Sequence, residues 1–456
     1  MKNNNTVCAI STAQGEGGIG VIRVSGEKSI EICDSIFKSI SGKPLSNLKG
    51  YTAALGYVYK NGEKLDEVIA TVFHEPHSYT GENVVELSCH GGLFITSEVL
   101  RTVIEAGAKP AEAGEFTKRA FLNGKLDLTE AEAVIDIISA KSKAAARAAL
   151  LAKEGALWRK TEKIKNSLVN TAAHLSAWVD YPEEDIEEVT EESLKTTFKE
   201  CMFELDKLLK TYDMGQTVKE GLDTVIAGKP NTGKSTIMNL LSGHDRSIVT
   251  DIPGTTRDII EETVNVGNVT LRLSDTAGMR ETEDTVEKIG VDIAKSRIEN
   301  CGLVMAVFDS GRELDEDDKK LLEIIKDAPT IAVINKTDLE NKLNEKYIED
   351  RIETTVRISA KTEEGVENLV SEIEKIAGCD NFNPSEGILA NERQRNAILN
   401  AKKSLQEAID ALNLGMTFDA VTVTLEDAIE NILELTGERV SEVVVDNVFH
   451  NFCVGK

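Results

Sequence analysis

The spacing of apolar residues changes along the chain. In residues 1–118, short apolar runs alternate with glycine-rich turns, and helical spacing occurs only near 28–40 and 94–106. This pattern predicts a mixed α+β domain. From 119 to 216, alanine and other apolar residues recur at helical intervals, with a break near Tyr181 and Pro182. Helical spacing returns after Asn383 and Pro384 and continues to residue 456. An all-α region built from two separate stretches is therefore expected.

Residues 217–379, between the two helical stretches, follow a third pattern. Apolar, β-branched runs alternate with helical segments, as in an α/β domain with a parallel sheet. We therefore predict a multidomain protein: an α+β domain at 1–118, an all-α helical domain formed by 119–216 together with 380–456, and an α/β domain at 217–379 inserted into it. Each helical part can bury its apolar face against the other. Thr129 and Glu132 match a capping box and predict a helix N-terminus with Thr129 as N-cap.

The inserted domain contains a phosphate-binding sequence, Gly-Lys-Pro-Asn-Thr-Gly-Lys-Ser, at residues 228–235. It follows a buried-strand pattern at 224–227 and precedes a helical pattern at 236–241, so its backbone N–H groups would surround phosphate oxygens at a helix N-terminus. Lys234 would reach the β- and γ-phosphates, and Ser235 would bind Mg²⁺. The expected contacts of this P-loop are Asn231, Thr232, Gly233, Lys234, Ser235 and Thr236.

Three further motifs follow predicted strands in the order found in GTPases. Asp-Thr-Ala-Gly at 275–278 would hold Mg²⁺ through water and contact the γ-phosphate. Asn-Lys-Thr-Asp at 335–338 favours guanine, because the carboxylate of Asp338 can accept from N1 and N2 groups that adenine lacks. Ser-Ala-Lys at 359–361 would contact the guanine carbonyl. With the switch-like loop at 250–258, the further predicted GTP-binding residues are Thr250, Thr255, Thr256, Asp275, Thr276, Ala277, Gly278, Asn335, Lys336, Asp338, Ser359, Ala360 and Lys361.

Two positions bear on how GTP would be hydrolysed. Met279 stands where Ras-like GTPases carry a glutamine that orients the attacking water, and a methionine cannot do this. Another group must therefore act on the water. Thr256 is a candidate Mg²⁺ ligand beside Ser235. Asn231 offers a carbonyl oxygen suited to a monovalent cation, and a turn-forming role is the alternative for this residue.

Composition and charge narrow the setting. Hydrophobic residues make up 41% of the chain, and no apolar run approaches the length of a membrane span. Seven cysteines without C-x-x-C spacing favour the reducing cytoplasm over a disulfide framework or a zinc site. The net charge of −26 argues against non-specific affinity for nucleic acid from bulk charge. Residues 217–379 and 380–456 alone carry net charges of −12 and −7, which disfavours a basic RNA-binding module there.

Motifs at the two ends of the chain are more specific than the GTPase motifs. They are Gly-Ile-Gly-Val-Ile-Arg-Val-Ser-Gly at 18–26, Tyr-Thr-Gly-Glu at 79–82, His-Gly-Gly at 90–92, the stretch at 114–127, and Phe-Cys-Val-Gly-Lys at 452–456. With these motifs the chain resembles, from end to end, the MnmE (TrmE) family of tRNA uridine-modification GTPases. The resemblance implies a first domain that binds a one-carbon tetrahydrofolate and forms a homodimer.

The resemblance also implies site residues. For 5,10-methylenetetrahydrofolate, or 5-formyltetrahydrofolate as an analogue, the matching contacts are Arg23, Glu86, Lys125 and Lys456. In the family, K⁺ lies where two GTPase domains meet, and its matching ligands are Asn231, Thr250, Ile252 and Thr255. Glu287 matches the glutamate that orients the catalytic water and would act with Lys234, although on the residues alone it is more simply an exposed helix acid. Cys453 is a candidate nucleophile or general acid, and a buried structural cysteine is the competing interpretation.

The family works with an FAD-dependent partner, MnmG (GidA), in a heterotetramer, so FAD would enter only through that partner. The resemblance implies a potassium-dependent GTPase that adds a carboxymethylaminomethyl or aminomethyl group to C5 of the wobble uridine of tRNA. Two alternatives stay open. One is a ribosome-assembly GTPase without modification activity, and the other is a stand-alone folate-dependent aminomethyltransferase regulated by GTP.

Overall fold

The computed structural model describes residues 5–180, 188–244, 262–273, 298, 301–380, 382–383, 385 and 387–456. The chain divides into two compact units. The first is Met1–Ile135 with Ile432–Lys456, and the second is Asp136–Asn431. The predicted multidomain class is confirmed, since an α+β sheet domain, a helical region from two parts of the sequence and an inserted α/β sheet are all present. Within the described residues, no helix is long and apolar enough to cross a membrane.

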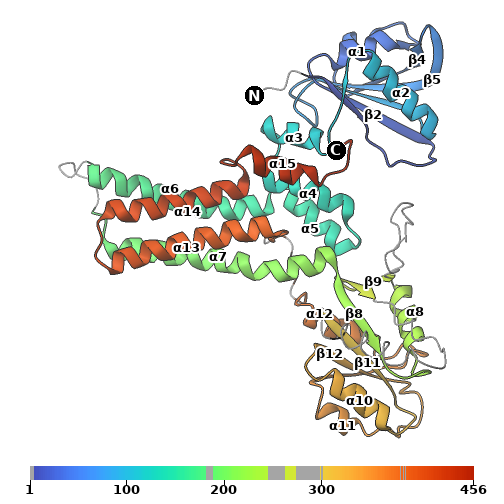
Figure 1. Cartoon of the computed structure of the whole chain (residues 1–456), viewed down its shortest axis with the longest axis vertical. Coiled ribbons are helices and arrows are strands. Elements are labelled where there is room, and N and C mark those ends of the chain that lie inside the picture. The colour runs from blue at the N-terminus through green and yellow to red at the C-terminus, as the bar shows by residue number, and fades with distance from the viewer. Residues whose placement is uncertain are drawn as a thin grey trace, which may run out of the picture. The chain divides into compact units, whose positions relative to one another are not determined.

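The first unit is built on a seven-stranded sheet with the order β3-β4-β5-β6-β2-β1-β7. Its neighbouring strands are antiparallel except for the β1–β7 pair. Alternate strand residues such as Ile22, Val24 and Leu87 are fully buried on one face, which α1 and α2 cover (Figure 1). The elements are β1 (Val7–Ile10), β2 (Ile19–Ser25), α1 (Ser29–Ile36), β3 (Phe37–Ser39), the 3₁₀ turn Leu45–Asn47, β4 (Thr52–Lys60), β5 (Glu63–Phe73), β6 (Val84–His90), α2 (Leu93–Glu105) and β7 (Lys109–Pro110).

Three helices complete the first unit around a second apolar cluster. They are α3 (Glu115–Leu122), the first turns of α4 (Leu128–Ser139) and α15 (Glu442–His450). Leu128, Phe449 and Phe452 are buried between them. The C-terminal part of the chain therefore belongs to the same unit as the N-terminal sheet, which brings residues more than 300 positions apart into contact.

The predicted capping box of α4 is wrong by two residues. Asp127, not Thr129, is the capping residue: its Oδ1 accepts from the backbone N–H of Glu130 (2.7 Å), and Glu130 Oε2 accepts from the N–H of Asp127 (2.9 Å). Thr129 lies inside the helix and donates its hydroxyl to Asp127. Both D-x-x-E and T-x-x-E fit the sequence signature. The earlier start places Leu128, which is fully buried, within the helix.

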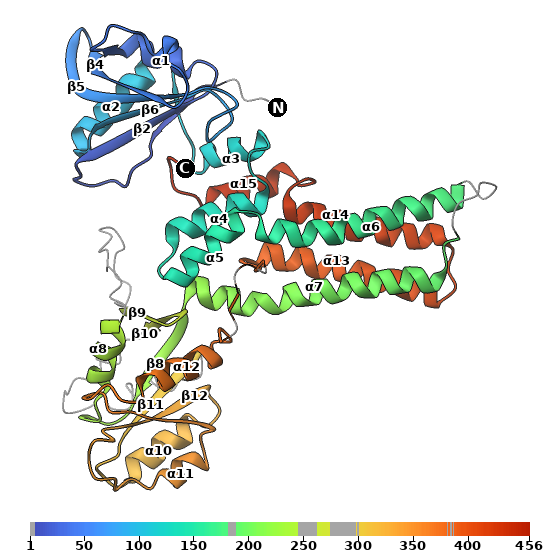
Figure 2. The same cartoon turned by 180° about the vertical axis from the view of Figure 1, so that it is seen from behind.

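The helical part of the second unit contains α5 (Lys143–Lys153), α6 (Ala156–Asp180), α7 (Glu191–Glu220), α13 (Glu392–Asn413) and α14 (Phe418–Thr436). The last residues of α14, from Ile432 on, belong to the first unit. The long helices α6, α7, α13 and α14 lie lengthwise beside one another in both views (Figures 1 and 2). Helix α7 precedes the inserted domain in sequence and α13 follows it, and these two helices pack on each other, as predicted. Helix α7 continues to Glu220 before Gly221 ends it.

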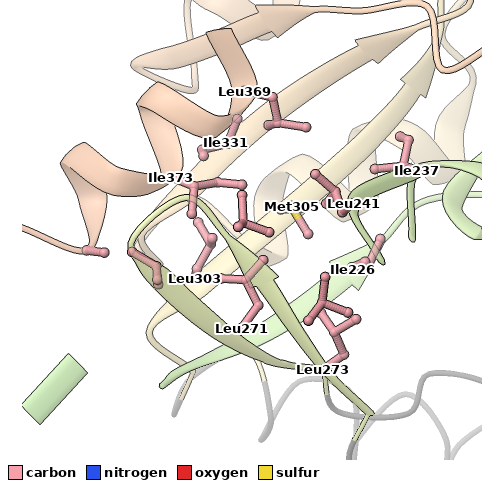
Figure 3. Packing of buried hydrophobic residues seen from close by; sticks show 14 of the residues in the cluster. Ile226, Ile237, Leu241, Leu271, Leu273, Leu303, Met305, Ile331, Leu369 and Ile373 are labelled. Carbon is pink, nitrogen blue, oxygen red and sulfur yellow. The ribbon is translucent and has the colours of Figure 1, made fainter. Parts of the chain in front are cut away.

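The inserted domain carries a six-stranded sheet with the order β13-β12-β11-β8-β10-β9, parallel except for β9. Strand residues are buried on both faces; Figure 3 shows one of the two clusters, which includes Met305, Ile226 and Ile331. The elements are β8 (Leu222–Ala227), α8 (Lys234–His244), β9 (Glu262–Val266), β10 (Val269–Leu273), β11 (Leu303–Asp309), α10 (Glu316–Ile324), β12 (Thr330–Asn335), α11 (Glu345–Glu349), β13 (Thr354–Arg357) and α12 (Val366–Ile376).

Candidate functional site

The P-loop connects the end of β8 to the start of α8, as predicted. Its turn requires glycine at position 233, which has a φ of +96°, and a Cβ there would clash with the side-chain nitrogen of Asn335. Asn231 also has a positive φ, of +65°, a conformation that asparagine tolerates better than most residues. In P-loops, such a turn lets backbone N–H groups surround phosphate oxygens at a helix N-terminus.

Lys234 is half-buried under this loop. Its ammonium donates to the backbone carbonyls of Gly228 and Lys229, each at 2.6 Å. Burial lowers the pKa of Lys234. The cation is thus held where the loop closes on itself, and an anionic phosphate offers it a stronger acceptor than two neutral carbonyls.

Asn335 joins the motifs that the sequence predicted as neighbours. Its Nδ2 donates to the carbonyl of Thr232 in the P-loop (2.9 Å), and its Oδ1 accepts from the N–H of Ala360 (3.0 Å). The side chain is almost fully buried, and both of its polar atoms are satisfied within the protein. Asn335 therefore ties the loop to the Ser-Ala-Lys motif.

Lys336 makes a second link. Its ammonium donates to the backbone carbonyl of Asn231 (2.7 Å) and to Oδ2 of Asp309 (2.6 Å). Burial alone would raise the pKa of Asp309, but the bond from Lys336 and its other partners lower it overall. Asp309 was not predicted as a site residue. Its place at the end of β11, beside the strand that ends in Asn335, is the signal that could have found it.

The residues predicted to recognise the base lie close together. The Oδ1 atom of Asp338 accepts from the hydroxyl of Ser359 (2.8 Å), and Asp338 itself is exposed. Ser359 is fully buried, so the bond holds the carboxylate in a fixed orientation while leaving it open to a ligand. Lys361 is exposed next to these residues. The described part of the site can therefore receive a phosphate chain and a base with two adjacent N–H donors.

Another unpredicted contact holds the P-loop from outside. Lys229 forms ion pairs with Asp315, the N-cap of α10, and with Asp317. The pKa of Asp315 is lowered to about 2, chiefly by the hydrogen bond that Asp315 accepts from Lys229. Several predicted residues lie outside the described part of the chain: Thr250, Ile252, Thr255, Thr256, Asp275, Thr276, Ala277, Gly278 and Glu287.

A second candidate site lies on the sheet of the first unit, on the face opposite α1 and α2. Arg23 of β2 and Glu86 of β6 are register partners, and Arg23 Nε donates to Glu86 Oε1 at 2.9 Å. The guanidinium lies 5.3 Å from the ring centroid of Tyr79 and 5.4 Å from that of Phe116. Its Nη1 reaches the carbonyl of Gly455 at 3.5 Å. Three distant segments therefore meet at Arg23.

The segment 453–456 is fixed at this place by backbone contacts. Ser11 Oγ donates to the carbonyl of Gly455 (3.0 Å), and the N–H of Phe116 donates to the carbonyl of Lys456 (3.1 Å). Gly455 has a φ of +98°, and a Cβ there would clash with the carbonyl of Ile10, so only glycine fits. Cys453 is exposed, so the interpretation of Cys453 as a buried structural cysteine is wrong.

Lys125, another expected folate contact, is exposed three residues beyond the end of α3 and donates to the carbonyl of Pro76 at 3.2 Å. The loop that contains Pro76 also carries Tyr79, whose hydroxyl is hydrogen-bonded to Thr117. The nearly buried Arg119 holds this loop through Glu82 (3.1 Å) and also binds Glu115 (2.7 Å). Sequence reasoning missed Arg119, because its motif carries several charged residues and no pattern says which is buried.

The chain matches two family descriptions that together span nearly all of it: "GTP-binding protein TrmE N-terminus" over residues 6–125 and "MnmE helical domain" over residues 128–453. The tRNA modification GTPase MnmE of Clostridioides difficile (strain 630) is 43% identical, over 99% of both chains. The MnmE of Thermoanaerobacter sp. (strain X514) is 41% identical over the same shares. Among solved structures, the G domain of the T. maritima FeoB iron transporter is 26% identical with a TM-score of 0.27, over 34% of this chain and 98% of that one.

Identity at this level, across both the N-terminal and helical regions and around an intact set of GTPase motifs, is decisive. The chain belongs to the MnmE family and is a GTP hydrolase that takes part in tRNA modification.

Proposed function

We propose that this protein is a potassium-dependent GTPase that binds a one-carbon tetrahydrofolate and, with an FAD-dependent partner of the MnmG (GidA) type, adds a carboxymethylaminomethyl or aminomethyl group to C5 of the tRNA wobble uridine. The observation that carries the proposal is the meeting of Arg23, Glu86 and the 453–456 segment at one place in a chain of this family.

The polar groups at this place suit a folate. The carboxylate of Glu86 can accept from the amino and ring N–H groups of a pterin, and Arg23 can bind a carboxylate or a carbonyl oxygen. Lys125 and Lys456 supply further cations for the glutamate end of the ligand. When bound, the folate supplies the one-carbon unit that is transferred. Cys453 lies in the same segment as Lys456, and its exposed thiol is accessible to act as nucleophile or general acid.

For hydrolysis, we assign roles from the P-loop geometry where the residues are described, and from the family resemblance for the residues outside the described part of the chain. Lys234 would exchange its two loop carbonyls for the β- and γ-phosphates, while Ser235 and Thr256 would hold Mg²⁺. The backbone carbonyl of Asn231 is already bonded to Lys336, so its exposed side chain is the part free to bind K⁺, together with Thr250, Ile252 and Thr255. Glu287 would orient the attacking water.

The working assembly in this proposal is cytoplasmic. Two copies of the chain form a homodimer, and with two copies of the flavoprotein they make a heterotetramer that receives tRNA. Hydrolysis would act as a conformational switch between the two GTPase domains of the dimer.

Binding of 5-formyltetrahydrofolate, followed by isothermal titration calorimetry, tests the folate part. Arg23→Met and Glu86→Gln should each weaken binding at least about tenfold, because each removes a hydrogen bond to a charged group. Arg101→Met is the matched control, since Arg101 is an exposed arginine of α2 that is paired with Glu98. Parental affinity in both site variants would contradict the folate assignment.

Steady-state GTP hydrolysis in KCl and in NaCl at equal ionic strength tests the cation. The rate should be high only in KCl and should collapse in Glu287→Ala. Equal rates in the two salts, unchanged in the variant, would reject this mechanism. The ribosome-assembly alternative would then be the one to examine.

A further inference from the structure

One stretch of the chain is strongly basic, although the chain as a whole is acidic. Residues 141–166 contain eight lysines and arginines and only two acidic residues, a net charge of +6 within a chain of −26. These residues form α5 and the first turns of α6, and all of them are described. Charge counted over the whole 119–216 stretch hides this basic segment, because α7 is acidic at its start.

The cations lie on the outer sides of the two helices. On α5, Lys143, Arg147 and Lys153 are exposed and recur at intervals of four and six residues, while Ala144, Ala145 and Ala149 are buried on the inner side. On α6, Arg159 and Lys163 are also exposed, and because they are four residues apart they lie on the same side of that helix. Only Glu154 and Gly155 separate the two helices (Figure 2). We call these exposed residues the α5–α6 basic surface.

These cations are not neutralised by neighbours. Among the described residues, no ion pair involves Lys143, Arg147, Lys153 or Lys163, and Arg159 donates only to a backbone carbonyl. Lysines elsewhere in the same unit commonly pair with carboxylates, as Lys195 does with Glu191 and Lys402 with Asp206. In so acidic a protein, an exposed basic surface without paired carboxylates is a local region of positive potential that can attract an anionic partner.

An aromatic side chain lies within the same surface. Trp158, at the first turns of α6, is 39% exposed. The chain has one other tryptophan, Trp178, which packs edge-on against Phe418 at 5.4 Å. Exposed aromatic side chains among cations stack on unpaired bases, whereas surfaces that bind only acidic peptides do not need them.

We propose that the α5–α6 basic surface binds the phosphate backbone of RNA, with Trp158 stacking on an unpaired base. The inference rests on the proposed function, which makes tRNA the RNA in question. A membrane is disfavoured because Ala144, Ala145 and Ala149 of α5 are buried in the protein, which leaves Leu150 as the exposed large apolar side chain of this helix, too little to anchor it in a lipid interface.

The test measures binding of unmodified, fluorescently labelled tRNA by anisotropy over a series of KCl concentrations. The variant Lys143→Gln/Arg147→Gln/Lys153→Gln should bind about tenfold more weakly or worse, with a salt slope reduced by about 2 to 3, one unit for each lost phosphate contact. The control is Lys195→Gln/Lys199→Gln/Lys207→Gln on α7, which removes the same charge from the same unit and should bind as the parent does. GTP hydrolysis should be unchanged in both triple variants.

A second readout follows the tryptophan. In Trp178→Phe, Trp158 is the only tryptophan, and tRNA should quench its fluorescence, whereas in Trp158→Phe the remaining signal should not respond. An unchanged salt slope in the α5 variant, or equal losses in both triple variants, would overturn the proposal. So would binding to phosphatidylglycerol vesicles that depends on the α5 cations while tRNA binding does not. Potassium-independent hydrolysis in a protein that binds tRNA through this surface would reject the proposed cation mechanism alone.

Discussion

Asn335 shows how one side chain organises the nucleotide site. It is buried, and each of its two polar atoms bonds to the backbone of a different segment, Thr232 in the P-loop and Ala360 in the Ser-Ala-Lys motif. A buried backbone group without a partner costs about 1–3 kcal/mol. The residue therefore contributes to stability as well as to the shape of the GTP site.

Replacing Asn335 with alanine should lower the free energy of unfolding by about 2–4 kcal/mol, because it leaves the carbonyl of Thr232 and the N–H of Ala360 without partners. Affinity for GDP should fall with it. Urea unfolding and nucleotide titration measure the two effects. Asn396→Ala, at an exposed position of α13, is the control and should stay within about 0.5 kcal/mol of the parent. Equal stability of the two variants would contradict the role given to Asn335.

Asp338 should decide the identity of the base. In Asp338→Asn, the amide still accepts from Ser359 but meets the N1 and N2 groups of guanine with a donor. We expect GTP affinity to fall by about a hundredfold or more, because both N–H donors of the base lose their acceptor. Xanthosine triphosphate, which carries an oxygen at C2, should become the better ligand. Competition between the two nucleotides for hydrolysis measures the change, and a variant that still prefers GTP would refute the assignment.

At this scale the sequence predicted where the proposed binding residues lie, and it predicted the residues that support them poorly. Asn335, Lys336 and Asp338 follow strands that are recognisable from their apolar runs, so their positions at one sheet edge follow from topology. Arg119 and Asp309 could not be predicted in the same way. Their roles depend on which charged side chain is buried, and that is decided by contacts with segments far away in sequence.

At the scale of elements, the start of α4 depends on one carboxylate. Asp127 caps the helix through Oδ1, but its Oδ2 is buried without a hydrogen-bond partner. Burial raises the pKa of Asp127, and the bonds from Glu130 and Thr129 only partly offset this. The folded state therefore holds a proton on this carboxyl more tightly than the unfolded chain does. Ionisation of Asp127 consequently lowers the stability of the folded state as the pH rises above the pKa that this group has in the unfolded chain.

Asp127→Asn keeps the capping oxygen and removes the charge. The stability of the variant relative to the parent should therefore increase as the pH is raised from about 4 to 7, the range that begins at the ordinary aspartate pKa. Asp127→Ala loses the cap as well and should cost about 1 kcal/mol. Urea unfolding at several pH values measures both. A pH-independent difference between Asp127→Asn and the parent would show that the buried charge has no effect.

The elements themselves were largely predictable, and their ends were not. The strands of the inserted domain match their apolar runs because those strands are buried on both faces. Helix ends depend on local competition instead. Asp127 and Thr129 are both possible caps, and the hydrogen bonds between Asp127 and Glu130 show that Asp127 is the one used. Similarly, α7 continues through Glu220 and ends only at Gly221, so the helix runs directly to the first strand of the GTPase domain.

For the whole molecule, the insertion of the GTPase domain has a testable consequence. The chain leaves the helical region at the end of α7 and returns at 387–390. These two points are neighbours, because Gln216 Nε2 donates to the carbonyl of Ala390 (3.1 Å) and the N–H of Leu389 donates to Thr211 Oγ1 (3.1 Å). A linker of about six residues spans about 20 Å, which is enough to join them.

Replacing residues 221–386 with a six-residue Gly-Ser linker should therefore leave the helical region folded, because helices α7 and α13 keep their mutual contacts. The deletion exposes a few side chains that the inserted domain covers. Ala144 and Ala145 of α5 and Val218 of α7 lose their contact with that domain, which costs about 1–3 kcal/mol for the valine and less for the alanines. We expect a cooperative thermal transition and a helical circular dichroism spectrum, with no GTP binding. A deletion of 205–386, which also removes the buried Leu205 and Leu208 of α7, should not fold. If both deletions unfold alike, the inserted domain is needed for the helical fold rather than being carried by it.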